Sequence, residues 1–228
     1  MARVNFGMGQ SIPPITKNLL IINVLVFFAQ MAFERTYPVY DMFGLHHYTS
    51  ELFKPYQLVT HMFMHGGFMH LFFNMFALYM FGGTVERLWT PKKFFLFYFA
   101  CGLGAAAVQM GWYAFENREL DQAVLSSADY ITYQMLLAQQ VTVGASGAIM
   151  GLLVAFGFSF PNTQLIVFPI PVPIKAKWAI TGMIALDVFG GFASLPGDQV
   201  AHFAHLGGAV TGLIMLMIWK RTNRRTFY

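Results

Sequence analysis

Six long apolar runs alternate along the chain with polar segments that carry charged residues and several prolines. A helix that crosses a bilayer needs about 20 mostly apolar residues, and each run, with its flanks, can supply a helix of that kind. To within a few residues the runs cover positions 19–33, 69–81, 94–112, 146–160, 178–192 and 201–219, and the second span is expected to end at Gly82-Gly83. The pattern therefore predicts an all-α membrane protein with a bundle of six transmembrane helices.

The composition supports this class. Of the 228 residues, 57% are hydrophobic and only 11% are charged, whereas about a quarter of a soluble domain is charged. The mean hydropathy is +0.54. The length suits one domain of six spans, so we interpret residues 1–228 as a single transmembrane domain. The lone Cys101 excludes an intrachain disulfide framework, and the first run, with no small-residue cleavage site after it, is expected to be a signal anchor.

The segments between the runs differ in character. Residues 1–16 form a short polar N-terminal segment, and the aromatic and aliphatic residues of 34–60 predict a folded connection at the membrane interface. In the polar stretch 116–140, Ser126 or Ser127 can cap a short helix. Prolines exclude a regular helix after the fourth run. They are Pro161, Pro169, Pro171 and Pro173.

The distribution of charge predicts the orientation. If the N-terminus is inside, only Arg35, Lys54 and Arg118 of the 14 lysines and arginines lie outside, and the basic tail 220–228 is cytoplasmic. The positive-inside rule is then satisfied at every short loop, which predicts an N-in/C-in topology. The net charge of +4 follows from this topology, so no nucleic-acid partner is expected. We expect the plasma (inner) membrane of a bacterium.

A serine between glycines marks the start of the fourth run, in Gly144-Ala145-Ser146-Gly147. Glycines allow a tight turn and close approach of a substrate, and a helix start offers unpaired N–H groups. These features suit a nucleophile with an oxyanion site. The alternative is a capping serine ahead of Gly147-x-x-x-Gly151, a small-residue face for helix packing in lipid, and on the tetrapeptide alone it is the more common case.

Other polar residues favour the nucleophile over the capping serine. In the predicted topology the second, fourth and sixth spans all run from outside to inside. Each has polar residues near its outer start: His70 and Asn74, Ser146, and His205. Because Gly208-x-x-x-Gly212 also allows close helix approach, these groups are predicted to meet at one depth. Polar groups inside a membrane are functional by default.

The residue types indicate nucleophilic catalysis. A serine needs a base, and a nearby histidine, here His205, is the usual one. Neither Asp187 nor Asp198 has a spacing that places it beside this histidine, so the sequence predicts a Ser-His dyad rather than a triad. His70 and Asn74 are candidate donors to the developing oxyanion.

Three motifs resemble those of rhomboid intramembrane serine proteases, and they occur in the family's order. They are the second-span segment 60–75 (THMFMHGGFMHLFFNM), Gly144-Ala145-Ser146-Gly147, and Ala204-His205-Leu206-Gly207-Gly208. The resemblance implies a rhomboid-like bundle that cleaves transmembrane helices of other proteins within the lipid bilayer, without a cofactor. It implies Ser146 as nucleophile, His205 as base, and an oxyanion hole of His70, Asn74 and the backbone N–H groups of Ser146 and Ala145. It also implies structural roles near the site for His65, Glu86, Gly144, Gly147 and Gly208.

Two features depart from the family's pattern. Tyr56-Gln57 stands where an aromatic–arginine pair is often found, and the connection 116–140 is long. Both concern the packing of loops rather than the chemistry.

The sequence leaves three alternatives. His61 and His65 are spaced i, i+4 but lack the glutamate of His-Glu-x-x-His, so no metal site is expected. A catalytically inactive relative could bind or dislocate membrane helices, but the presence of both Ser146 and His205 argues against it. A transporter or channel ranks third, because no inverted repeat or ring of charge is visible. Asp187 is expected to bond a neighbouring helix or the first loop.

Overall fold

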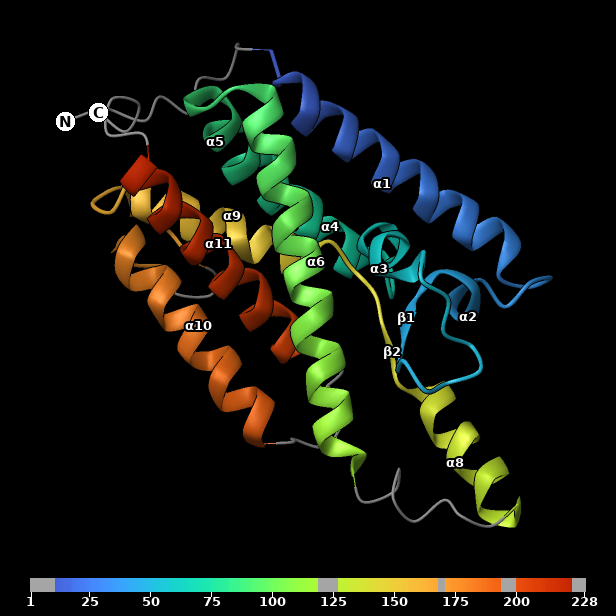
Figure 1. Cartoon of the computed structure of the whole chain (residues 1–228). Helices are drawn as coiled ribbons and strands as arrows, with labels where there is room; N and C mark the ends of the chain where they lie inside the picture. The colour runs from blue at the N-terminus through green and yellow to red at the C-terminus, as the bar shows by residue number, and fades with distance from the viewer. Residues whose placement is uncertain (1–10, 119–126, 168–170, 194–199, 223–228) are drawn as a thin grey trace.

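Each of the six predicted apolar runs lies in a helical stretch of the computed structural model, which describes residues 11–118, 127–167, 171–193 and 200–222 (Figure 1). Within these residues, four helical stretches are long and apolar enough to cross a membrane: α1 (Pro14–Phe33), Phe68–Leu88, α6 (Pro91–Glu116) and α11 (His202–Thr222). The fourth run forms the shorter apolar helix α9 (Ser146–Ser159), and the fifth lies in α10 (Ala176–Ala193). The chain is a helical multi-pass membrane protein.

The second span is longer than its apolar run. It comprises α4 (Phe68–Ala77), a π-helical turn η2 (Leu78–Gly82) and α5 (Gly83–Leu88). The expectation that the span ends at Gly82-Gly83 is wrong, because both glycines keep helical backbone angles. A side chain at position 82 would lie 2.9 Å from Leu78 and 3.4 Å from Phe94. Glycine at this position therefore permits close packing instead of ending the helix.

Glu86 joins the start of α1 to α5. Its carboxylate accepts hydrogen bonds from the N–H groups of Ile15 (2.9 Å) and Thr16 (2.7 Å) and from the Thr16 hydroxyl (2.8 Å). The first N–H groups of a helix have no partner within it, and negative charge is favoured at that end. Pro14, which has no N–H, occupies the first helical position. The buried carboxylate thus caps α1 from another helix.

Helix α9 packs against α6 and α11 (Figure 1). Its contact with α11 is backbone to backbone: a side chain at position 212 would lie 3.0 Å from the Gly151 Cα, and one at position 208 would overlap Gly147. A side chain at position 151 would lie 3.1 Å from the Gly208 carbonyl oxygen. The two Gly-x-x-x-Gly faces therefore meet each other, as the small-residue pattern suggested. This contact brings the starts of α9 and α11 together.

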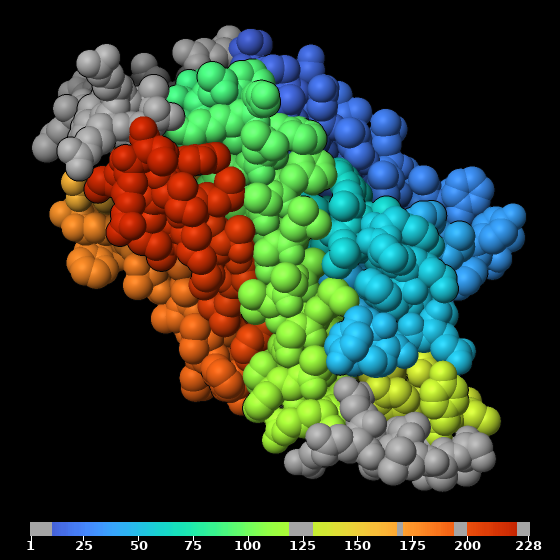
Figure 2. All heavy atoms as spheres, viewed as in Figure 1, coloured from blue at the N-terminus to red at the C-terminus, as the bar shows by residue number. Residues whose placement is uncertain are grey.

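The outer surfaces of several helices are apolar, as contact with lipid requires. On α1, Leu25 and Phe28 are exposed, whereas Asn23 and Gln30 are buried. Large exposed apolar side chains also cover α4, α10 and α11. Figure 2 shows α6 as a band between α11 on one side and the connection from α1 to α4 on the other.

The connection from α1 to α4 is folded, as predicted. It contains α2 (Val39–Phe43), β1 (Leu45–His46), α3 (Gln57–Thr60) and a 3₁₀ turn η1 (His61–Phe63). Strand β1 pairs antiparallel with β2 (Val141–Thr142), with Leu45 opposite Thr142 and His46 opposite Val141. This pairing was not predicted. It ties the connection to the segment that leads directly into α9.

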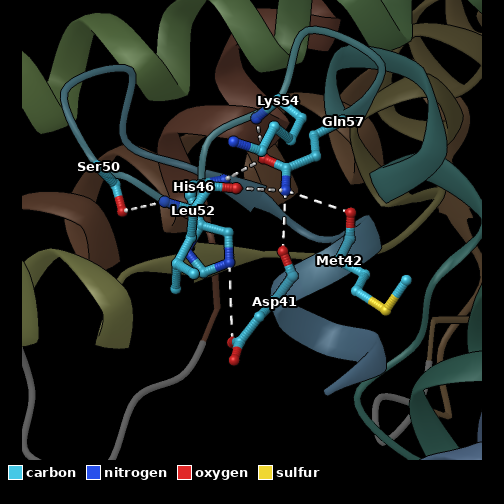
Figure 3. A network of polar contacts seen from close by, with 7 residues as sticks. All are labelled: Asp41, Met42, His46, Ser50, Leu52, Lys54 and Gln57. Atoms are coloured by element: carbon cyan, nitrogen blue, oxygen red, sulfur yellow. Dashed lines mark hydrogen bonds and ion pairs between the residues drawn. The ribbon is translucent and has the colours of Figure 1, made fainter. Parts of the chain in front are cut away.

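Gln57 organises this connection (Figure 3). Its side chain is fully buried. Its amide nitrogen donates to the carbonyl oxygens of Asp41 (2.9 Å), Met42 (3.3 Å) and Leu52 (2.9 Å), while its oxygen accepts from the N–H groups of His46 (3.4 Å) and Lys54 (3.2 Å). One neutral side chain thus satisfies several buried backbone groups that would otherwise be costly. Gln57, at the position where an arginine is often found in the family, thus makes a hydrogen-bond network of its own.

The other connections are shorter or partly described. The predicted short helix in 116–140 is α8 (Ser127–Gln139), which is tied to the first connection by Tyr133 Oη to Thr49 Oγ1 at 2.7 Å. Between α9 and α10, where prolines exclude a helix, β3 (Gln164–Leu165) pairs with β4 (Ile174–Lys175). Several residues singled out in the sequence lie outside the described residues: Ser126, Pro169, Asp198, positions 1–10 and the tail beyond 222.

Candidate active site

One cavity of about 960 Å³ is lined by all four of the polar residues predicted to converge. His70 and Asn74 reach it from α4, Ser146 from the start of α9 and His205 from the start of α11. The remaining lining is mostly apolar. The sequence argument that parallel helices deliver these groups to one place is thus matched by the geometry.

The turn before Ser146 requires glycine. Gly144 has φ +125°, a conformation that L side chains rarely adopt, and its N–H donates to the His61 carbonyl at 2.9 Å. A side chain there would also meet the His70 ring at 2.8 Å. The fully buried Ala145 follows, and α9 begins at Ser146. The first N–H groups of a helix have no partner within it, so those at the start of α9 can serve an oxyanion site.

His205 is held by a carboxylate. Its Nδ1 lies 3.0 Å from Oδ1 of Asp187 on α10, and His202 Nδ1 lies 2.8 Å from the same oxygen. The expectation that no carboxylate is placed beside the histidine is therefore wrong. The expectation that Asp187 bonds a neighbouring helix is confirmed. An ionised carboxylate only accepts hydrogen bonds, so in the neutral ring of His205 the proton is on Nδ1 and Nε2 has a lone pair.

The start of α11 is fixed from a second side. Gln109 of α6 accepts a hydrogen bond from the backbone N–H of Ala204 at 3.0 Å, which satisfies one unpaired donor of the helix start. A side chain at position 147 would lie 3.2 Å from the Ala204 carbonyl oxygen. Gly147 and Gln109 together hold the start of α11, which carries His205, close to the start of α9, which carries Ser146.

The Nδ1 atom of His70 is bonded in the opposite sense to that of His205. Its Nδ1 accepts a hydrogen bond from the Gly66 N–H at 3.2 Å, so in the neutral ring Nε2 carries the proton. The position where a Gly144 side chain would begin lies 2.8 Å from this Nε2 and 3.5 Å from Ser146 Oγ. The Nε2–H of His70 is therefore a donor close to the serine.

Asn74 lies one turn further along α4. Its buried side-chain nitrogen donates to the His70 carbonyl at 2.9 Å. This bond uses one of the two amide protons, and the second is available to the cavity. Asn74 and His70 thus supply two neutral donors from one helix face.

His65 packs against His70. The two rings are edge to face with centroids 5.2 Å apart. The His65 backbone exchanges two hydrogen bonds with the Gln30 side chain, at 2.8 and 3.2 Å. Burial, together with the neighbouring His70, lowers the pKa of His65 to about 4. Burial likewise lowers the pKa of His61 to about 4, and His61 Nδ1 donates to the Gln57 carbonyl at 2.8 Å.

The sequence interpretation missed the contact of Asp187 with His205. A signal existed, because His202 and His205 share one face of α11 at i, i+3 and a lone acid lies in the preceding span. Intramembrane acids usually have a partner. What the sequence does not contain is the rotation of α10 that turns this acid toward α11.

Comparison with known proteins gives a consistent result. The Rhomboid domain family model matches residues 52–222. Rhomboid protease AarA of Providencia stuartii is 29% identical over 225 residues, which cover 94% of this chain and 74% of that protein. Rhomboid protein 1, mitochondrial, of Saccharomyces cerevisiae is 27% identical over 94% of this chain and 59% of its own length.

A third relative is the presenilin-associated rhomboid-like protein, mitochondrial, of Mus musculus, 26% identical over 69% of this chain and 38% of its own length. The chain thus spans between about a third and three quarters of the length of these relatives. The family model covers well over half of the chain, across the helices that carry His70, Ser146 and His205. This chain belongs to the rhomboid family.

Proposed function

We propose that this chain is an intramembrane serine endopeptidase that cleaves transmembrane helices of other membrane proteins. The observation that carries the proposal is the cavity in which Ser146, at a helix start, lies with a histidine whose Nε2 is free to accept a proton. The membrane helices and the protease among the relatives support the substrate class.

The mechanism follows from the atoms. His205 Nε2 takes the proton of Ser146 Oγ as Oγ forms a bond to the scissile carbonyl carbon. Negative charge gathers on the carbonyl oxygen, where the N–H groups at the start of α9, His70 Nε2–H and Asn74 stabilise it. The imidazolium then gives its proton to the leaving amine as the C–N bond breaks. Water releases the acyl group by the same steps.

The proposal includes the topology and the location. Six spans with both termini inside place the cavity toward the outer face, in the plasma membrane of a bacterium; the charge distribution supports this orientation. After replacement of Cys101, an impermeant thiol reagent added outside should label a cysteine at position 122 and not one at position 92. Labelling of position 122 only after permeabilisation would invert the orientation.

A serine-directed probe tests the activity. A fluorophosphonate should label the wild type and cleavage of a single-span model substrate should be measurable, whereas Ser146→Ala should show neither. Residues that act as one unit lose activity non-additively, so Ser146→Ala/His205→Ala should be no worse than Ser146→Ala. A folded wild-type protein that is neither labelled nor active would instead be an inactive relative that binds membrane helices.

A further inference from the structure

Asp187 stands out among the buried polar groups. It lies on α10, its side chain is 10% exposed, and its flanking residue Leu186 is 70% exposed on the outer surface. A carboxylate in a membrane helix is costly, and such groups face the protein interior and pair. Here both partners come from α11: Oδ1 lies 2.8 Å from His202 Nδ1 and 3.0 Å from His205 Nδ1.

The two contacts have different consequences. His205 lines the cavity with Ser146, and His202 does not belong to that lining. A bond from His205 Nδ1–H to the carboxylate selects the tautomer in which Nε2 is unprotonated, and it fixes the ring plane. The carboxylate also stabilises the imidazolium that forms when the serine proton is transferred. We propose that Asp187 is a positioning residue that holds His205 in its base form and orientation, an inference that rests on the proposed function.

A purely structural tie between α10 and α11 does not need this carboxylate. The two helices already meet through glycines, because a side chain at position 191 would lie 2.9 Å from the Phe203 ring and one at position 190 would overlap the His202 ring. Phe203 also stacks on Trp112 of α6, with ring centroids 3.7 Å apart. An apolar residue at 187 would keep these contacts. The carboxylate supplies what they cannot, namely an acceptor aligned on His205.

The experiment compares Asp187→Asn with His202→Leu in the full chain in detergent. Asp187→Asn keeps the shape but presents an amide to His205 and loses the negative charge. His202→Leu removes the other hydrogen bond to the same oxygen and leaves the His205 contact. For each, kcat and KM for a single-span model substrate, the rate of fluorophosphonate labelling of Ser146 and the melting temperature are measured beside wild type and Ser146→Ala.

Asp187→Asn should lower kcat and the labelling rate about 100-fold, the scale of positioned acid–base catalysis, with KM changed less than about twofold. His202→Leu should keep kcat within about threefold even if its melting temperature falls more. Equal losses of kcat in both variants, in step with their melting temperatures, would make Asp187 a helix tie and overturn the proposal. An inactive, unlabelled wild type would instead refute the proposed function itself.

A second measurement does not depend on turnover. In protein labelled with ¹⁵N-histidine in the His202→Leu background, the ring nitrogens of His205 should report Nδ1–H when Asp187 is present. In the double variant with Asp187→Asn, the Nε2–H tautomer should gain population. The same tautomer in both proteins would also overturn the proposal.

Discussion

Two histidines reach the cavity from different helices, and their Nδ1 atoms are bonded in opposite senses. On α4, His70 Nδ1 accepts from the Gly66 N–H, so Nε2 carries a proton. On α11, His205 Nδ1 donates to the Asp187 carboxylate, so in the neutral ring Nε2 carries no proton. In the proposed mechanism the same side chain is thus a donor in one region and a base in the other, and the partner of Nδ1 decides which.

The surroundings of the two histidines reinforce the difference. His70 has neutral neighbours, with the His65 ring packed against it and Asn74 bonded to its carbonyl. His205 has a carboxylate on α10. A neutral donor suits an oxyanion that develops only during the reaction. A base next to a carboxylate suits the uptake of a proton.

Replacing each histidine by glutamine should separate the two roles. A glutamine amide can donate a hydrogen bond but cannot accept the serine proton. His205→Gln should therefore lose cleavage and probe labelling to the Ser146→Ala background, the largest effect expected here. His70→Ala should lower kcat about 100- to 1000-fold, as for the loss of one oxyanion donor, and His70→Gln should recover at least about tenfold of this loss.

Two results would contradict the assignment of different roles to the two histidines. Clear turnover in His205→Gln would show that another group takes the proton. Turnover in His70→Ala close to wild type, with a much lower melting temperature, would make His70 a packing residue. Melting temperatures of all three variants provide the control for folding.

Much of the fold could be predicted because it depends on local patterns. Apolar runs identify the helices, and Gly147-x-x-x-Gly151 with Gly208-x-x-x-Gly212 indicates which of them approach closely. The convergence of Ser146 and His205 follows from parallel spans. These inferences need only the period of a helix and the thickness of a bilayer.

The features that were missed depend on contacts between distant segments. The acceptor for His205 depends on the rotation of α10, and the strand pairing of His46 with Val141 spans much of the chain. Gln57 was noted only as a departure, although it bonds five backbone groups. The end predicted for the second span at Gly82 was wrong for a different reason. A glycine that permits close packing looks the same in sequence as one that ends a helix.

Two buried histidines lie near the site: His65 packs against the His70 ring, and the His61 carbonyl accepts from the Gly144 N–H. Both are expected to stay neutral, and a change of pH tests this. Burial holds the pKa of both His61 and His65 at about 4 in the folded protein, against about 6.5 in an unfolded chain. At pH 7 both are neutral in either state, so nothing is lost. Between pH 6.5 and 4 the unfolded chain binds protons that the folded protein does not, so the free energy of unfolding falls as the pH falls.

The expected loss at pH 5 is roughly 2 kcal/mol for each of the two histidines, so the melting temperature in a mild detergent should be lower at pH 5 than at pH 7. His61→Asn offers a matched control, since the asparagine amide can still donate to the Gln57 carbonyl but does not titrate. Its melting temperature should fall less between the two pH values than that of the wild type. A melting temperature that is unchanged or higher at pH 5 would mean that these histidines accept protons in the folded state. At pH 5 the His65 ring that packs against His70 would then be charged.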